Sequence, residues 1–148
     1  MVLKHIFAAY NFPMQRILLT AIITLFLLAC NQSSVKTKKN SDPLEAGREF
    51  IEASLKGDYD YAKQYLLADT TNLMSFDRFV EFDKNLPAKD KQGYKDANII
   101  IDSTETLSDS VTIINYSNTY KKKASKIKLV KKNNEWLVDF KYTFLDSL

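Results

Sequence analysis

Residues 126–142 read KIKLVKKNNEWLVDFKY, and this stretch decides the fold. Apolar and polar side chains alternate on both sides of a central pair, Asn133-Asn134. The apolar side chains expected on one face are Ile127, Leu129, Trp136, Val138, Phe140 and Tyr142. A period of two is the pattern of a half-buried strand, and Asn tolerates the positive φ of a two-residue hairpin turn. The stretch therefore predicts two antiparallel strands joined at Asn133-Asn134.

Two further strands are expected upstream of this hairpin. Ala97, Ile99 and Ile101 alternate with polar residues, and residues 110–120 are rich in residues that favour strands. Before residue 93 the apolar spacing is helical instead.

The helical part of the chain predicts three segments, over residues 42–57, 58–66 and 75–86. Asp42 is the expected N-cap of the first helix, which a glycine ends, and Ser75 is the expected N-cap of the third. Helices followed by an antiparallel meander predict an α+β domain. We expect two to three N-terminal helices packed on one face of a curved antiparallel sheet of about four strands.

Composition excludes several chemistries. Among 148 residues, Cys30 is the only cysteine and His5 the only histidine. A disulfide within the chain is therefore excluded, and so is a Cys/His zinc site or a Ser–His–Asp triad in residues 30–148. Residues 1–29 hold two of the 21 basic residues and no acidic residue, so the remainder has 19 basic and 18 acidic residues. With this balance we expect no nucleic-acid partner, and we expect no metal or cofactor.

An apolar run near the start indicates an export signal. Residues 17–28 read ILLTAIITLFLL and follow Arg16. The run has about the length of a signal-peptide apolar region and is shorter than the roughly 20 residues of a membrane-spanning helix. Translation from Met1 or from Met14 gives such a leader, and both starts stay open.

The residues that end this run, Leu27-Leu28-Ala29-Cys30, resemble the lipobox of bacterial lipoproteins. The resemblance implies cleavage between Ala29 and Cys30 and attachment of diacylglycerol to the Cys30 thiol, so that lipid holds the chain on a membrane. The alternatives are a core cysteine or an uncleaved signal anchor. We expect a signal peptide over residues 1–29, a lipidated cysteine and flexible tether over 30–41, and one domain over 42–148. The expected location is the cell membrane or outer membrane, with the domain outside the cytoplasm.

Most of this domain carries a second resemblance. Its opening and its close contain DP at 42–43, FIEA at 50–53, KGDY at 56–59, AK at 62–63 and LVKKNNEWLVDF at 129–140. These segments resemble small lipoproteins with a nuclear-transport-factor-2-like domain of unknown function. The resemblance implies a cone-shaped, cystatin-like fold that encloses a pocket, and it implies no particular activity.

Candidate site residues follow from that pocket. The aromatic side chains proposed to line it are Tyr65, Tyr116, Trp136 and Tyr142; packing in the core is the alternative for them. Asp102 and Asp139 fall on polar strand faces, where we expect solvated carboxylates, and no residue matches a catalytic position. Lys121, Lys122 and Lys123 form a candidate basic contact surface, within a basic hairpin that reaches Lys132.

These features favour a non-enzymatic, lipid-anchored envelope protein that binds a small ligand or a partner protein. Two alternatives stay open. The first is a small cofactor-free lyase or isomerase with a Tyr/Asp pocket. The second is an envelope-surface interaction module that uses the basic hairpin, whose lysines otherwise protect an edge strand.

Overall fold

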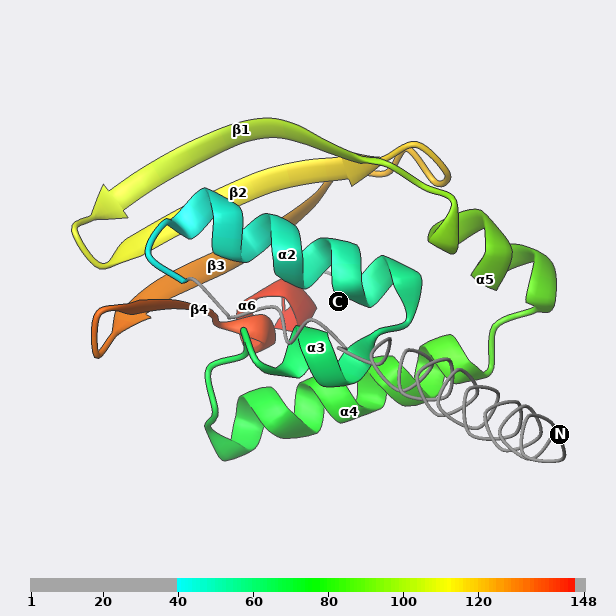
Figure 1. Ribbon diagram of the computed structural model, residues 1–148, viewed down its shortest axis with the longest axis horizontal. Helices are drawn as coiled ribbons and strands as arrows, with labels where there is room; N and C mark the ends of the chain where they lie inside the picture. The colour runs from blue at the N-terminus through cyan, green and yellow to red at the C-terminus, as the bar shows by residue number, and fades with distance from the viewer. Residues whose placement is uncertain (1–39, 146–148) are drawn as a thin grey trace, which may run out of the picture. The chain divides into compact units, whose positions relative to one another are not determined.

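The computed structural model describes residues 40–145, so the predicted signal peptide, Ala29 and Cys30 lie outside the described residues. Four helices precede a four-stranded sheet and a fifth follows it (Figure 1). Their bounds are α2 Pro43–Lys56, α3 Tyr59–Lys63, α4 Thr70–Lys84, α5 Ala88–Lys95, β1 Ile99–Ser108, β2 Val111–Asn118, β3 Ser125–Lys132, β4 Glu135–Val138 and α6 Phe140–Leu145. The predicted α+β class is confirmed, with more helices than expected. No helix in this range is long and apolar enough to cross a membrane.

The first helix begins and ends where the sequence predicts. The Asp42 carboxylate accepts a hydrogen bond from the backbone N–H of Glu45 at 2.9 Å. Gly57 ends α2 with φ 75°, a left-handed conformation that glycine adopts without a steric penalty. Local chemistry therefore fixes both ends of α2.

The predicted start of the third helix at Ser75 is wrong. Helix α4 begins at Thr70, because the Asp69 carboxylate caps it by accepting from the backbone N–H of Asn72 at 2.9 Å. Its first three residues, Thr70, Thr71 and Asn72, are polar, so the apolar pattern does not reach its start. Helix α5 was not predicted either, since it buries no residue and so has no apolar stripe.

The sheet is an open antiparallel meander in the order β1-β2-β3-β4. Asn133 and Asn134 have φ values of 51° and 64°, which confirms the predicted two-residue turn between β3 and β4. The register pairs Ile114 with Ile127 and Leu129 with Val138, so these apolar side chains form one buried surface. Two register shifts in β1 interrupt its pairing with β2 and contribute to the curvature.

The last strand is shorter than predicted. Strand β4 ends at Val138, and Phe140 and Tyr142 belong to α6 rather than to the strand face of Trp136. The chain turns at Asp139, whose backbone N–H donates to the Lys128 carbonyl at 2.8 Å. Two tertiary hydrogen bonds then favour a helix over a continued strand. Asn72 Nδ2 donates to the Asp139 carboxylate, and the backbone N–H of Lys141 donates to Asn72 Oδ1.

Helix α2 covers the buried face of the sheet (Figure 1). It approaches closely at Gly47, where an added Cβ would lie 2.5 Å from Cδ1 of Ile114 and 3.2 Å from Cδ1 of Ile127. Below α2, the rings of Phe50, Phe76 and Phe140 form a cluster with centroids 5.5–5.7 Å apart, which joins α2, α4 and α6. The core therefore lies between the helices and β2–β4.

Candidate functional site

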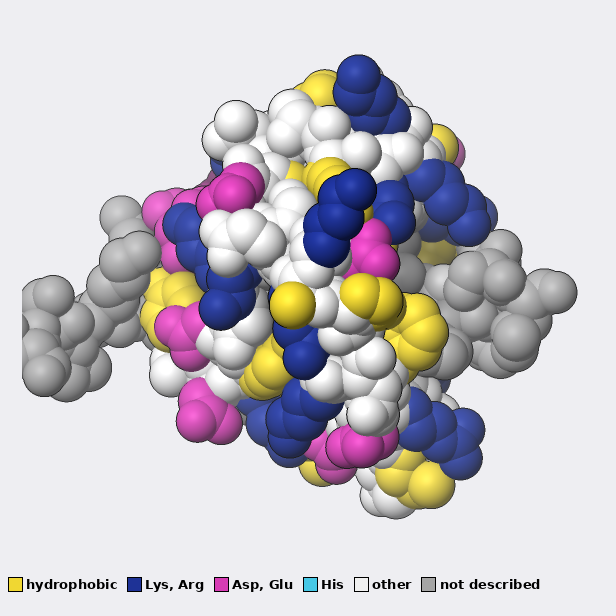
Figure 2. Space-filling view, turned by 90° about the vertical axis from the view of Figure 1, so that its right-hand side faces the viewer, with side chains coloured by type: hydrophobic (Ala, Val, Ile, Leu, Met, Phe, Trp, Pro, Cys, Tyr) yellow, Lys and Arg dark blue, Asp and Glu magenta, His cyan; other side chains and the backbone are white. Residues whose placement is uncertain are grey.

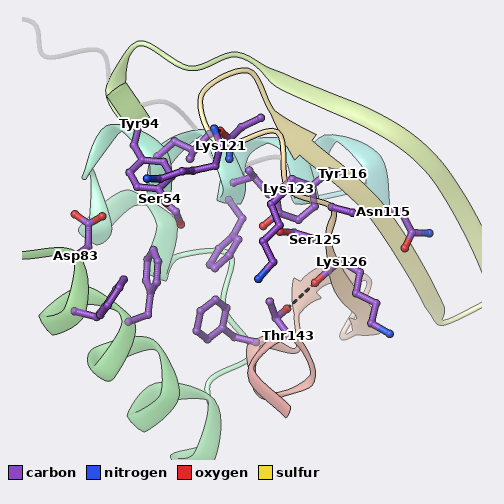
Figure 3. A pocket seen from close by; sticks show the side chains of 18 of the residues that line it. Ser54, Asp83, Tyr94, Asn115, Tyr116, Lys121, Lys123, Ser125, Lys126 and Thr143 are labelled. Carbon is purple, nitrogen blue, oxygen red and sulfur yellow. Dashed lines mark hydrogen bonds between the residues drawn. The ribbon is translucent and has the colours of Figure 1, made fainter. Parts of the chain in front are cut away.

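A pocket of about 720 Å³ opens between the helices and the sheet near the ends of α2, α4 and β2 (Figure 3). Residues from α2, α4, α5 and α6 form its helical side, and β2, β3 and the loop between them form its other side. A pocket of this volume falls within the range of small-molecule sites, about 300–1,000 Å³.

Apolar side chains dominate the helical wall of the pocket. They are Phe50, Ile51 and Leu55 from α2, Phe79 and Phe82 from α4, Leu86 after α4, and Phe140 from α6. The Phe79 and Phe140 ring centroids lie 5.6 Å apart, which continues the core cluster into the pocket. Phe82 is 65% exposed, an unusual state for so large an apolar side chain. The wall thus offers an aromatic surface that reaches solvent.

Hydroxyl groups also line the pocket, among them those of Ser54 and Tyr116. The Ser54 Oγ atom is buried without a hydrogen-bond partner among the described residues. An unpaired buried hydroxyl costs about 1–3 kcal/mol, which a bound polar atom would recover. On the sheet side, burial raises the pKa of the Tyr116 hydroxyl to about 12, so it is protonated at neutral pH.

The loop between β2 and β3 brings lysines to the pocket. Lys121 is held by Asp90, with 3.0 Å between its Nζ and the carboxylate, and by the Tyr120 ring at 4.8 Å. Lys123 is exposed, has no ion pair with another described side chain, and extends toward the centre of the pocket in Figure 3. Figure 2 shows lysine and arginine side chains beside exposed hydrophobic ones on the face at the right of Figure 1. The pocket therefore combines an apolar wall with a cationic edge.

One carboxylate, that of Asp83 on α4, also lines the pocket. It accepts a hydrogen bond from the Tyr59 hydroxyl. Burial is the main cause that raises the pKa of Tyr59 above its usual value, and the contact with Asp83 raises it further. In Figure 3, Asp83 lies on the side of the pocket away from Lys126 and Asn115.

Of the four aromatic residues proposed to line the pocket, Tyr116 does so. Tyr65 and Trp136 lie in the core, 2% and 6% exposed. Tyr142 is half-buried in α6, with its ring 5.2 Å from the Nζ of Lys126. The structure thus separates these four residues instead of gathering them in one site.

The basic hairpin is also divided. Lys121 and Lys123 line the pocket, whereas Lys122 does not. Lys131 and Lys132 lie at the opposite end of β3, about 25 Å from the loop if each of the intervening residues adds roughly 3.3 Å.

Asp139 corrects the expectation of a solvated carboxylate. It is 6% exposed, accepts from Asn72 at 3.2 Å, and lies 3.4 Å from the Nζ atoms of both Lys128 and Lys141. This network joins α4, β3 and α6 beside the core. Asp102 is exposed, as predicted.

Sequence reasoning missed the wall of the pocket. The helical spacing of Phe79 and Leu86 indicates that their side chains face inward, but it does not distinguish a packed core from the lining of a cavity. Within residues 40–145, no three His, Cys, Asp or Glu side chains cluster so that they could hold a metal ion.

No protein-family model matches the chain, and no curated protein matches it.

Proposed function

We propose that this chain is a lipid-anchored envelope lipoprotein whose domain, of the nuclear-transport-factor-2-like kind, binds a small molecule without converting it. The observation that carries the binding function is the open pocket of about 720 Å³, with a phenylalanine wall on its helical side and polar groups on its sheet side. Apolar walls with a small number of convergent polar groups are the usual composition of ligand sites.

The membrane anchor rests on the sequence Leu27-Leu28-Ala29-Cys30 at the end of an apolar leader. A thiol is required because its sulfur forms the thioether with diacylglycerol. Cys30→Ser should therefore abolish incorporation of labelled fatty acid in cells and leave an unprocessed precursor. Normal maturation of the Cys30→Ser chain, still bound to membranes after alkaline washing, would refute the anchor.

The binding function is tested by filling the pocket. Leu55 is half-buried and lines it, so Leu55→Trp should place an indole in the space of the ligand. Leu107 on β1 is 57% exposed and does not line the pocket, and Leu107→Trp is the matched control. The full chain is purified from cells in each form and denatured, and the released small molecules are quantified by mass spectrometry.

We expect a molecule in near-stoichiometric amount from the wild type and from Leu107→Trp, and a loss of about tenfold or more from Leu55→Trp. Thermal unfolding of the three proteins shows whether each is folded. Equal amounts from the folded Leu55→Trp chain, or none from the wild type, would contradict binding in this pocket.

A second candidate, a small cofactor-free lyase or isomerase, is favoured by one observation. The Asp83 carboxylate lines the pocket and is hydrogen-bonded to the Tyr59 hydroxyl, which is a pairing of acid and phenol that such enzymes use. If the molecule recovered above is incubated with fresh protein, an enzyme converts it and Asp83→Asn stops the conversion. Recovery of the unchanged molecule supports a binding protein.

A further inference from the structure

We propose that the ligand is a single-chain anionic amphiphile, held with its apolar chain against the phenylalanine wall and its anionic head at Lys123. This inference rests on the proposed binding function and deepens it by naming the class of ligand. The shared chemistry is a carboxylate or phosphate head on a long hydrocarbon chain.

The apolar part follows from the wall. Phe79 and Phe140 form one continuous aromatic surface with the core, and Phe82 extends this surface to solvent. A compact polar ligand would leave most of this surface exposed to water. A long chain covers it from the interior to the mouth, so that the exposed Phe82 gains a partner.

The anionic head follows from the charges that face the pocket. Its lining contains three lysines and one acidic residue, Asp83. Lys121 is already paired with Asp90, which lies outside the lining. Asp83 is engaged by Tyr59 from α3, across the pocket from the β2–β3 loop. The Nζ atom of Lys126 lies 5.2 Å from the Tyr142 ring, and in Figure 3 the Lys126 side chain points away from the centre of the pocket. Lys123 is the lining lysine whose side chain Figure 3 shows directed into the pocket, so we assign the anion to it.

A hydroxyl without a partner supports the same reading independently. Serine within a helix commonly donates to a backbone carbonyl one turn earlier. The Ser54 Oγ atom makes no such bond, although it is buried in the lining of the pocket. An oxygen of the ligand is an acceptor that it lacks among the described residues.

The test uses the full chain in membranes and a photoreactive probe, dodecanoate with a diazirine near the end of its chain. Cross-linked peptides are identified by mass spectrometry after irradiation. Competitors share the dodecyl chain and differ in the head: dodecanoate, dodecyl phosphate, neutral dodecyl maltoside and cationic dodecylamine. Dodecanoate against dodecyl phosphate distinguishes the two anionic heads.

The matched variants are Lys123→Glu and Lys122→Glu, which make the same change of charge at neighbouring positions in one loop. Lys123 lines the pocket and Lys122 does not. We expect cross-links on the peptides that contain Phe79 and Phe82, protected at least tenfold better by an anionic competitor than by the neutral or cationic one. Lys123→Glu should weaken the protection by anions about tenfold, the effect of losing one charge-assisted hydrogen bond. Lys122→Glu should change it less than twofold.

The other outcomes separate failure of the anionic head from failure of binding. If cross-links map to the pocket but all heads compete equally, or if both variants act equally, the anionic head is refuted while the binding function stands. If neither the probe nor its methyl-ester version labels pocket residues, the amphiphile is refuted. The binding function is refuted as well only if no small molecule is recovered from the wild-type chain.

Discussion

Asn72 provides the sharpest test of how the fold is held together. Its side chain is fully buried, and it is the point at which α4 meets the turn into α6. Its Nδ2 donates to Asp69 at 2.8 Å and to Asp139 at 3.2 Å, and its Oδ1 accepts from the backbone N–H of Lys141 at 2.8 Å. Asn72→Ala removes all three hydrogen bonds and leaves the buried Asp139 without one of its donors.

The magnitude follows from these three bonds. The bond from the Lys141 N–H is neutral and contributes about 1 kcal/mol, and the bond to the buried Asp139 carboxylate contributes about 1.5–3 kcal/mol. Asp69 is 41% exposed, so solvent screens the third bond and its contribution is counted as about 0.5 kcal/mol. We expect Asn72→Ala to lower the free energy of unfolding by about 3–4.5 kcal/mol.

The assay is urea unfolding of the full chain, followed by far-ultraviolet circular dichroism. Asn85→Ala is the matched control, because Asn85 caps the other end of α4, is exposed, and donates to the Glu81 carbonyl at 2.8 Å. Asn85→Ala should lower the free energy of unfolding by about 0.5 kcal/mol. A loss below about 1 kcal/mol for Asn72→Ala, or equal losses for both variants, would refute the reasoning that this network fastens α6 to α4.

Three further predictions concern packing, an unsatisfied hydroxyl and pH. Gly47→Ala should lower the free energy of unfolding in urea by about 1–3 kcal/mol, because the added Cβ meets Ile114 Cδ1 at 2.5 Å. Adding Ile114→Val should recover part of this loss. A Gly47→Ala protein that is more stable than the wild type would contradict the close approach of α2 to the sheet. Thr112 Oγ1 is buried without a partner among the described residues, so Thr112→Val should be neutral or stabilise by about 1 kcal/mol, whereas Thr106→Val at the exposed paired position should change little. The Asn72 backbone N–H holds the pKa of Asp69 below its ordinary value of 3.8. A carboxylate whose pKa is lower in the folded state stabilises the fold above the unfolded-state pKa, and this stability is lost as pH falls through the folded-state pKa. The urea midpoint of the wild type should therefore fall below about pH 4, and it should fall by less in Asp69→Asn. An equal fall in the wild type and in Asp69→Asn would argue against Asp69 as the group responsible.

Local chemistry explains which elements the sequence could predict. Asp42 and Gly57 delimit α2, and Asn133-Asn134 form the β3–β4 turn, because each acts within a few residues of itself. Helix α5 gave no signal, since it is polar on all sides and buries nothing. Asp69 was missed as a cap because the apolar pattern of α4 becomes visible only later along the chain.

The pocket depends on contacts between distant parts of the chain. Its wall joins Phe50, Phe79 and Phe140, which come from three helices, and its cationic edge comes from the β2–β3 loop. Tyr65 and Trp136 are aromatic and occupy inward-facing positions of the pattern, as lining residues do, yet packing places them in the core. A periodic pattern indicates that a side chain faces inward, but it does not indicate whether another side chain fills the space opposite.

The sequence alone determined the α+β class, the order of helices before strands, the β3–β4 turn and the absence of a Cys/His metal site or disulfide. These follow from local periodicity, caps and residue counts. Tertiary structure alone decided that the chain leaves the sheet at Asp139 and that Phe140 packs against α4 as part of a helix. The physical reason is that buried partners distant in sequence, Asn72 above all, stabilise that turn more than a continued strand would.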